Sequence, residues 1–266
     1  MKVILIGAGN LATNLGKALG KAGHAIVQVY SRTLQSAVAL AEQLSCGATN
    51  DLHAVRNDAD IYIISVKDSV LAEVVGQLCA GKGDKIFLHT AGSMPLGVFE
   101  GCAENYGVLY PMQTFSKSRE VEFSEIPCFI EANNAETLAE IGQLVRSVSD
   151  HVVTMSTEDR RYLHLAAVWT CNFTNHCYDI AARLLADHDI DFRYMLPLID
   201  ETARKVHTMT PRQAQTGPAV RYDANVIAAQ MKLMEQNPLQ QQLYEWLSKS
   251  IHQASEEGEG QPASNP

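Results

Sequence analysis

The chain opens with the stretch Lys2-Val-Ile-Leu-Ile-Gly7-Ala-Gly9-Asn-Leu-Ala12-Thr-Asn-Leu-Gly16. The continuous apolar run before Gly7 predicts a buried strand, and the apolar spacing after Gly9 predicts a helix. Gly7 permits a tight turn, Gly9 lets the backbone approach a pyrophosphate, and Ala12 allows close packing of helix on strand. Because a helix start attracts anions, the stretch predicts a dinucleotide-binding turn. The expected cofactor-binding residues of this turn are Gly7, Gly9, Asn10 and Leu11.

The second predicted strand, Ala25–Tyr30, indicates which nucleotide the turn binds. A site that prefers NAD usually has Asp or Glu at the end of this strand, where the carboxylate holds the ribose hydroxyls. Here Ser31 and Arg32 follow the strand instead. A hydroxyl and a planar guanidinium suit a 2′-phosphate, so these two residues predict NADP(H) as the cofactor. The alternative for Arg32 is an ordinary solvated surface charge.

Strand and helix patterns alternate through the first 155 residues. Further strands are expected at 60–66, 85–90, 106–110, 127–131 and 151–155, and helices at 34–44, 70–79 and 135–148. Strands separated by helices imply right-handed crossovers and a largely parallel sheet covered on both faces. We therefore expect an α/β domain over residues 1–155 with a doubly wound Rossmann sheet.

The pattern changes after Met155. Ser156 to Asp159 reads as a helix cap, and residues 160–187 are apolar around most of a helix. Helical stretches follow near 192–209 and 223–250, which predicts an all-helical C-terminal domain over residues 156–254. The wide apolar surface of its first helix suggests that a second copy of the chain covers part of it. The acidic, small and polar residues 255–266 predict a disordered tail.

Composition excludes several classes of protein. The net charge of −9 without a basic cluster argues against nucleic acid or an anionic membrane as a partner. The six cysteines show no metal-type pairing, and there is no secretory leader or long apolar span, so a cytoplasmic protein is expected. Neither an H-E-x-x-H motif nor a G-x-S-x-G motif occurs, which leaves a metal site and a serine nucleophile without support.

Several motifs together resemble one known family. They are Gly7-x-Gly9-x-x-Ala12, Tyr30-Ser31-Arg32-Thr33, Ser65-Val66-Lys67-Asp68, His89-Thr90-Ala91-Gly92-Ser93 and Tyr110-Pro111-Met112-Gln113-Thr114-Phe115. They look like those of the Rossmann-like NADP oxidoreductases related to pyrroline-5-carboxylate reductase, in the 6-phosphogluconate dehydrogenase superfamily. The segment from Ala214 to Asp223 resembles the inter-helix turn of a bacterial branch that has its own helical C-terminal domain. The likeness covers nearly the whole chain apart from the tail.

The resemblance implies an NADPH-binding domain, a homodimer joined through the helical domain, and an active cleft between the two domains. The motifs also follow strands at the edge where open parallel sheets bind ligands. Val66 and Lys67 would line the adenosine and ribose side, and Thr90 and Ala91 would face the nicotinamide. Two motif residues are expected on the substrate side, namely Ser93 and Gln113. The alternative is that these segments only start a helix or form a loop.

On the long predicted helix, His164, Val168, Asn172 and His176 recur every four residues and so share one stripe. Related hydroxyacid dehydrogenases carry a Lys and an Asn four apart on the corresponding helix. Asn172 matches that Asn, whereas Val168 stands in place of the Lys. We expect His164 to act as the general acid, because its usual pKa lies near neutrality, with Asn172 as a second catalytic residue. His176 is a candidate substrate contact.

Together these observations predict an NADP(H)-dependent oxidoreductase that transfers a hydride to or from a small carbonyl or imine substrate. One alternative is a true imine reductase acting on a pyrroline-like ring, which needs less acid catalysis because an iminium is already charged. Another is a non-catalytic NADPH-binding or sensing module whose helical domain binds a partner.

Overall fold

The computed structural model describes residues 1–258, which form two compact units. The first unit comprises residues 1–173, and the second begins at Thr174. The last strand ends at Thr154, close to the domain border predicted at residue 155. The division between the compact units falls later, so the first helix of the predicted helical domain belongs to the first unit.

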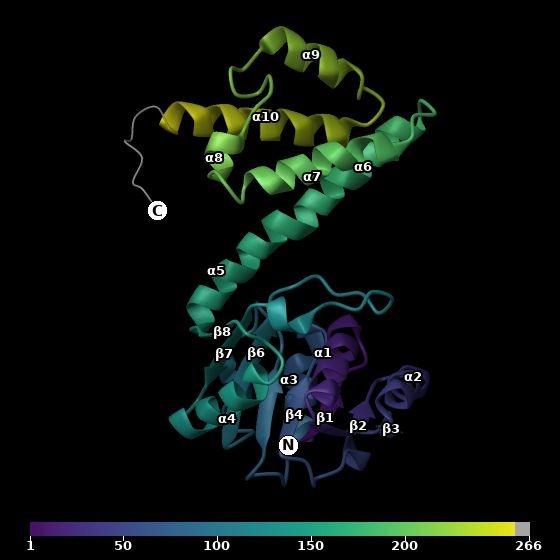
Figure 1. Ribbon diagram of the computed structural model, residues 1–266, viewed down its shortest axis with the longest axis vertical. Helices are drawn as coiled ribbons and strands as arrows, with labels where there is room; N and C mark the ends of the chain where they lie inside the picture. Colours follow the sequence, from purple (N-terminus) through teal and green to yellow (C-terminus); the bar gives the residue numbers. More distant parts are fainter. Residues whose placement is uncertain (259–266) are drawn as a thin grey trace. The chain divides into compact units, whose positions relative to one another are not determined.

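The first unit is built on a single eight-stranded sheet (Figure 1). Its strands are β1 (Lys2–Ile6), β2 (Ala25–Tyr30), β3 (Gly47–Thr49), β4 (Ile61–Ile64), β5 (Ile86–His89), β6 (Asn105–Pro111), β7 (Cys128–Ala132) and β8 (Val152–Thr154). Their order across the sheet is β3-β2-β1-β4-β5-β6-β7-β8, and only β6 and β7 pair antiparallel. The predicted doubly wound, largely parallel Rossmann sheet is confirmed. The order reverses between β1 and β4, where such sheets bind ligands.

Two features of the sheet were not predicted. Strand β3 has only three residues, Gly47–Thr49, too few to carry a periodic pattern. Strand β7 pairs antiparallel to β6, and the connection between them contains only the short 3-10 helix Phe123–Glu125, with no crossover α-helix of the kind that usually joins parallel strands.

Helices surround the sheet and make up the second unit. Those of the first unit are α1 (Asn10–Lys21), α2 (Leu34–Leu44), α3 (Asp68–Leu78), α4 (Ala135–Arg146), α5 (Thr157–Ala167) and a π-helix (Val168–Phe173), with further 3-10 helices at Leu52–Ala54 and Leu96–Phe99. Those of the second unit are α6 (Thr174–Ala186), the 3-10 helix Phe192–Met195, α7 (Leu196–Lys205), α8 (Pro211–Ala214), α9 (Ala224–Lys232) and α10 (Pro238–Gly258). From Thr174 to Gly258 the described chain contains no strand, as predicted. No helix within residues 1–258 has both the length and the apolar character needed to cross a membrane.

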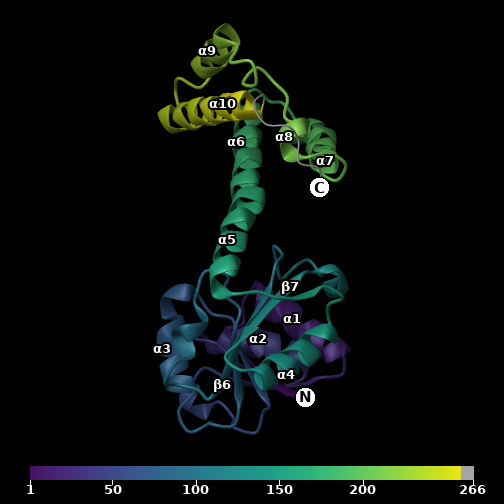
Figure 2. The same ribbon diagram turned by 90° about the vertical axis from the view of Figure 1, so that its left-hand side faces the viewer.

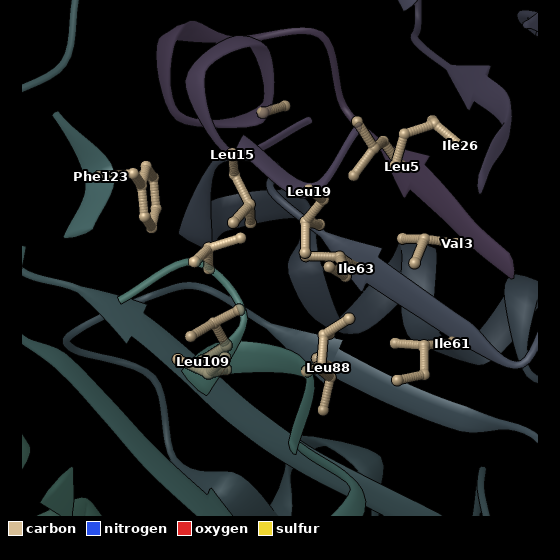
Figure 3. Close-up of a cluster of buried hydrophobic side chains, with 14 of the residues drawn as sticks. Val3, Leu5, Leu15, Leu19, Ile26, Ile61, Ile63, Leu88, Leu109 and Phe123 are labelled. Atoms are coloured by element: carbon tan, nitrogen blue, oxygen red, sulfur yellow. The ribbon is translucent and has the colours of Figure 1, made fainter. Parts of the chain in front are cut away.

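Alternate side chains of each strand enter two different cores. Val3 and Leu5 point to the face covered by α1, α2 and α4, and this core is drawn in Figure 3. Ile4 and Ile6 point to the opposite face, which is covered by α3 and the 3-10 helix Leu96–Phe99. Figure 2 shows α3 and α4 on opposite sides of the sheet. Burial on both faces explains why the strands read as continuous apolar runs.

Two expectations for the C-terminal part need correction. The helical stretch predicted over 223–250 consists of two helices, since α9 ends at Lys232 and α10 begins at Pro238, whose missing N–H is tolerated at a helix start. The disordered tail was predicted from residue 255, but α10 continues through Gly258. The Ser255 hydroxyl donates to the Val220 carbonyl at 3.0 Å, which holds this last turn in place. The rest of the predicted tail, residues 259–266, lies outside the described residues.

Candidate cofactor and substrate site

The predicted cofactor residues lie along one edge of the sheet. Strands β2, β1, β4 and β5 are parallel neighbours, so the residues that follow them gather where their carboxyl ends meet. These residues are Gly7, Gly9, Asn10 and Leu11 after β1, Ser31 and Arg32 after β2, Val66 and Lys67 after β4, and Thr90 and Ala91 after β5. The fold therefore brings four separate sequence motifs to one ligand-binding edge.

The turn after β1 has the geometry of a diphosphate cradle. Gly7 has a φ of 118°, and a Cβ atom there would lie 2.2 Å from the Ser65 carbonyl oxygen, so only glycine fits. Gly9 precedes α1, whose start has no side-chain cap and no acidic residue in its first turn. Ala12 is fully buried against the sheet. An uncapped helix start with this close backbone approach fits a bound diphosphate.

The side chains of Asn10 and Asn14 connect this turn to the loop after β6. Asn10 Nδ2 donates to the Phe115 carbonyl at 2.9 Å, and Asn14 Nδ2 donates to the Ser116 carbonyl at 3.1 Å. The Asn10 side chain thus holds this loop in place. A contact of Asn10 with the cofactor would therefore come from its backbone at the helix start. The loop itself lines the neighbouring pocket, described below.

Arg32 lies two residues after the end of β2, between Ser31 and Thr33, which is the N-cap of α2. The side chain is exposed, and within residues 1–258 its guanidinium forms no hydrogen bond or ion pair. Since no protein carboxylate occupies this guanidinium, it can pair with an added phosphate.

A pocket of about 480 Å³ lies within the first unit beside this edge. It is lined by Leu11, Thr90, Tyr110, Pro111, Met112, Gln113, Thr114, Phe115, His164, Ala167, Thr170, Cys171 and Asn172. The start of α1, the end of β5, the loop after β6, α5 and the π-helix all contribute to it. The predicted residues Leu11, Thr90, Gln113, His164 and Asn172 are therefore brought together.

His164 is held by two contacts. Its Nδ1 lies 3.0 Å from the hydroxyl oxygen of Tyr110, at hydrogen-bond distance, and the two rings meet edge to face. Gly92 packs against the imidazole so closely that a Cβ atom would lie 2.6 Å from Nδ1. Tyr110 was not singled out from the sequence, since its only signal was its place at the start of the Tyr110–Phe115 motif.

The stripe of every fourth residue is interrupted by the π-helix Val168–Phe173. The wider turn of a π-helix changes which side chains share a face, and such turns are frequent at functional sites. Thr170, Cys171 and Asn172 line the pocket, whereas Val168 does not. His176 lies in the second unit, where its Nδ1 is 3.9 Å from an Asp179 carboxylate oxygen.

The loops after β4 and β5 are hydrogen-bonded to each other. The Thr90 hydroxyl donates to the Ser65 hydroxyl at 3.1 Å. Ser93, predicted on the substrate side, donates its hydroxyl to the carboxylate of Asp68 at the start of α3 and does not line the pocket. In the structure Ser93 therefore connects the loop after β5 to the start of α3.

A buried ion pair, missed from the sequence, fastens α5 to the sheet. The Arg160 guanidinium, only 1% exposed, pairs with the Glu131 carboxylate on β7 and donates to the Met94 carbonyl at 2.7 Å. Thr157 donates its N–H and its hydroxyl to the same carboxylate, and its hydroxyl oxygen accepts from the N–H of Leu96. This network joins α5, β7 and the loop after β5.

His89 is buried at the end of β5, beneath the same loop. The N–H of Ala91 donates to its Nδ1 at 3.2 Å, which leaves Nε2–H to donate to the Pro95 carbonyl at 3.3 Å. Burial, with a smaller effect from the positive charge of Arg160, lowers the pKa of His89 to about 4. His89 is therefore neutral at physiological pH and shapes the loop by hydrogen bonds. Among residues 1–258, no group of three or more His, Cys, Asp or Glu could hold a metal ion.

The chain is similar to known NADP oxidoreductases in sequence and in structure. Residues 2–91 match the family described as NADP oxidoreductase, coenzyme F420-dependent, and residues 126–251 match a domain family of unknown function, DUF2520. A crystal structure of a Bacteroides fragilis protein, described as a candidate NADP oxidoreductase, shares 53% identity. The two structures align over 95% of this chain and 98% of the Bacteroides fragilis protein, with a TM-score of 0.92. No curated protein matches the chain.

More distant structures share the fold. An imine reductase from Myxococcus stipitatus in complex with NADP+ has 13% identity, covers 98% of this chain and 96% of its own, and has a TM-score of 0.69. A 1-pyrroline-5-carboxylate reductase from Streptococcus pyogenes has 17% identity and a TM-score of 0.61. The alignment covers 96% of this chain and 98% of the reductase. The resemblance expected from the motifs is confirmed.

The nucleotide cradle and the adjoining pocket define an enzyme of the Rossmann-type oxidoreductase class, with NADP(H) as its cofactor. The chain belongs to the family of the Bacteroides fragilis protein. In this chain the match to the NADP oxidoreductase family precedes the match to the DUF2520 domain.

Neutral His89 makes stability depend on pH in a defined direction. Its folded pKa of about 4 lies below the ordinary 6.5, so the unfolded chain binds the proton more readily, and stability is lost as the pH falls from 6.5 to 4. At about 1.4 kcal/mol for each pH unit, this group contributes about 3 kcal/mol. We expect His89→Gln to remove this part of the pH dependence in urea unfolding, whereas exposed His53→Gln retains it. Equal slopes for wild type and His89→Gln would contradict the assignment.

Proposed function

We propose that the protein transfers a hydride between NADP(H) and a small carbonyl or imine compound held in the pocket of the first unit. The observation that carries this proposal is the position of the pocket. Leu11 at the cofactor turn, Thr90 after β5 and His164 on α5 line the same pocket. A proton donor and a nicotinamide site that share one pocket meet the requirements of such a reaction. The cleft between the two domains, expected from the family, stays a prediction.

The bound cofactor supplies the hydride, and the protein supplies placement and a proton. The turn at Gly7 and Gly9 would hold the diphosphate, and Arg32 the 2′-phosphate. His164 would exchange the proton with the substrate oxygen or nitrogen, and Asn172 would hydrogen-bond the substrate or the carboxamide of the nicotinamide. Thr90 and Gln113 would complete the polar contacts of a pocket that is otherwise largely apolar.

Cofactor preference tests the first half of this proposal. We expect Arg32→Ala to weaken NADPH about tenfold to a hundredfold in calorimetric titration, because a hydrogen bond to a charged group contributes about 1.5–3 kcal/mol. NADH binding stays unchanged, since it lacks the 2′-phosphate. The control Arg146→Ala, an exposed arginine on α4, leaves both affinities unchanged. An Arg32→Ala protein that keeps the full preference for NADPH would contradict the role of Arg32.

Turnover measurements test the proposed hydride transfer to a substrate. A panel of small ketones, aldehydes and cyclic imines, followed by NADPH absorbance, should contain compounds that are reduced. His164→Gln should lower kcat about a hundredfold or more, the usual contribution of a positioned acid, while NADPH affinity stays the same. Tight NADPH binding with no turnover of any compound would instead support a binding or sensing module.

We further propose that the protein forms a homodimer and resides in a reducing compartment such as the cytoplasm. Tyr162, Leu165, Trp169 and Phe173 are all exposed on α5 and the π-helix, Leu165 and Trp169 by 53% and 58%. In the second unit, Leu198, Leu233 and Trp246 are also exposed. This many exposed apolar side chains favour a surface that binds another protein. A second copy of the chain is always present with the first, so we take it as the partner.

Light scattering during gel filtration checks the dimer. Wild type should elute with twice the chain mass, and Leu165→Glu should shift it toward the monomer, because a charge at an apolar interface is costly to desolvate. Leu34→Glu, at a 49% exposed position on α2, is the matched control and should stay dimeric. A monomeric wild type would refute this part of the proposal.

A further inference from the structure

The contact between Tyr110 and His164 is the one side-chain hydrogen bond between titratable groups that line the pocket, within the described residues. Tyr110 comes from the end of β6 and His164 from α5, so the pair joins two elements that are far apart in the sequence. In the described part of the chain, Nε2 of His164 has no hydrogen-bond partner. One imidazole nitrogen is thus held by protein, and the other remains able to reach a ligand.

The surroundings of the imidazole fix its position. Gly92 leaves only enough room for the ring, since a Cβ atom would lie 2.6 Å from Nδ1. Arg160 lies one helical turn before His164, and its buried pairing with Glu131 holds this part of α5 against the sheet. The charged and titratable groups near the pair include Arg160, which acts on Tyr110 and is paired with Glu131, and Cys171, which lines the same pocket.

The phenol of Tyr110 keeps its own proton under ordinary conditions. Burial raises its pKa above the usual value, and the positive charge of Arg160 opposes that shift only in part. A relay in which Tyr110 gives its proton to His164 would leave a phenolate in this buried position, which is unfavourable. The phenol oxygen retains acceptor capacity while protonated.

We propose that Tyr110 is a positioning residue that acts through His164: its hydroxyl oxygen accepts the Nδ1–H of the imidazole, so that the proton is exchanged with the substrate at Nε2. This inference rests on the proposed function of the pocket. In a catalytic triad a third residue, often a carboxylate, orients the catalytic base. Tyr110 would orient His164 in the same way, with a neutral phenol in place of the carboxylate.

The proton and electron balance closes without a tyrosinate. In the reductive direction the substrate carbon gains the hydride with its electron pair, the C=O or C=N π bond breaks, and NADPH is oxidised. The oxygen or nitrogen takes the proton from Nε2 of the imidazolium, which becomes a neutral imidazole with Nδ1–H still donated to Tyr110. The oxidative direction reverses each step, so the same tautomer serves both directions.

Nitrogen NMR of the full-length protein with 15N-labelled histidine tests the inference. At about pH 8.5, above the ordinary histidine pKa, we expect most of wild-type His164 to be in the Nδ1–H form. Tyr110→Phe should return the majority to Nε2–H, the form that free histidine favours in water. Tyr106→Phe is the matched control on the same strand, with its side chain against Phe99, and should change nothing. His164→Gln assigns the signals.

The outcomes separate this inference from the proposed function. A wild-type His164 that is mostly Nε2–H, or an unchanged tautomer in Tyr110→Phe, would overturn the role of Tyr110 even if NADPH binds. Failure to bind NADPH would refute the function, while the tautomer would still report on the pair. If Tyr110→Phe does not fold, Gly92→Ala serves as the second variant. Its Cβ displaces the imidazole from Tyr110 and should cause the same change of tautomer.

Discussion

The buried pairing of Arg160 with Glu131 is the interaction on which the site depends. The Glu131 carboxylate also accepts two hydrogen bonds from Thr157, and the guanidinium reaches the Met94 carbonyl. Removing one member of such a pair leaves an uncompensated charge in the interior, which costs far more than the net contribution of the pair. Helix, sheet and loop are consequently held in a single arrangement, although Arg160 Nε itself has no hydrogen-bond partner among the described residues.

Local patterns were sufficient to predict the cofactor edge. The turn at Gly7 could be recognised because one conformational requirement, a positive φ, combines with one steric requirement, the approach to the Ser65 carbonyl. The doubly wound, largely parallel sheet followed from the alternation of apolar strands and helices. The end of β2 was visible in the sequence, so Arg32 could be placed just beyond it, and its role toward a 2′-phosphate stays a prediction.

The substrate side depends on contacts between distant segments, which no local pattern contains. Tyr110 and His164 are 54 positions apart, and Arg160 and Glu131 are 29 apart. The stripe of every fourth residue assumed a regular α-helix, and the π-helix at Val168–Phe173 changes that spacing. A second copy of the chain was expected to cover part of the apolar helix, and Leu165 and Trp169 are exposed in the single chain. Composition reports that a surface is apolar, not which molecule covers it.

The hydrogen bonds from Asn10 and Asn14 have a thermodynamic consequence. They join the start of α1 to the Phe115 and Ser116 carbonyls, so the turn after β1 is connected directly to the loop that lines the neighbouring pocket. A nucleotide that shifted this turn would therefore also shift the pocket wall. Because linkage is reciprocal, a nucleotide and a pocket ligand coupled in this way would change each other's affinity by an equal factor.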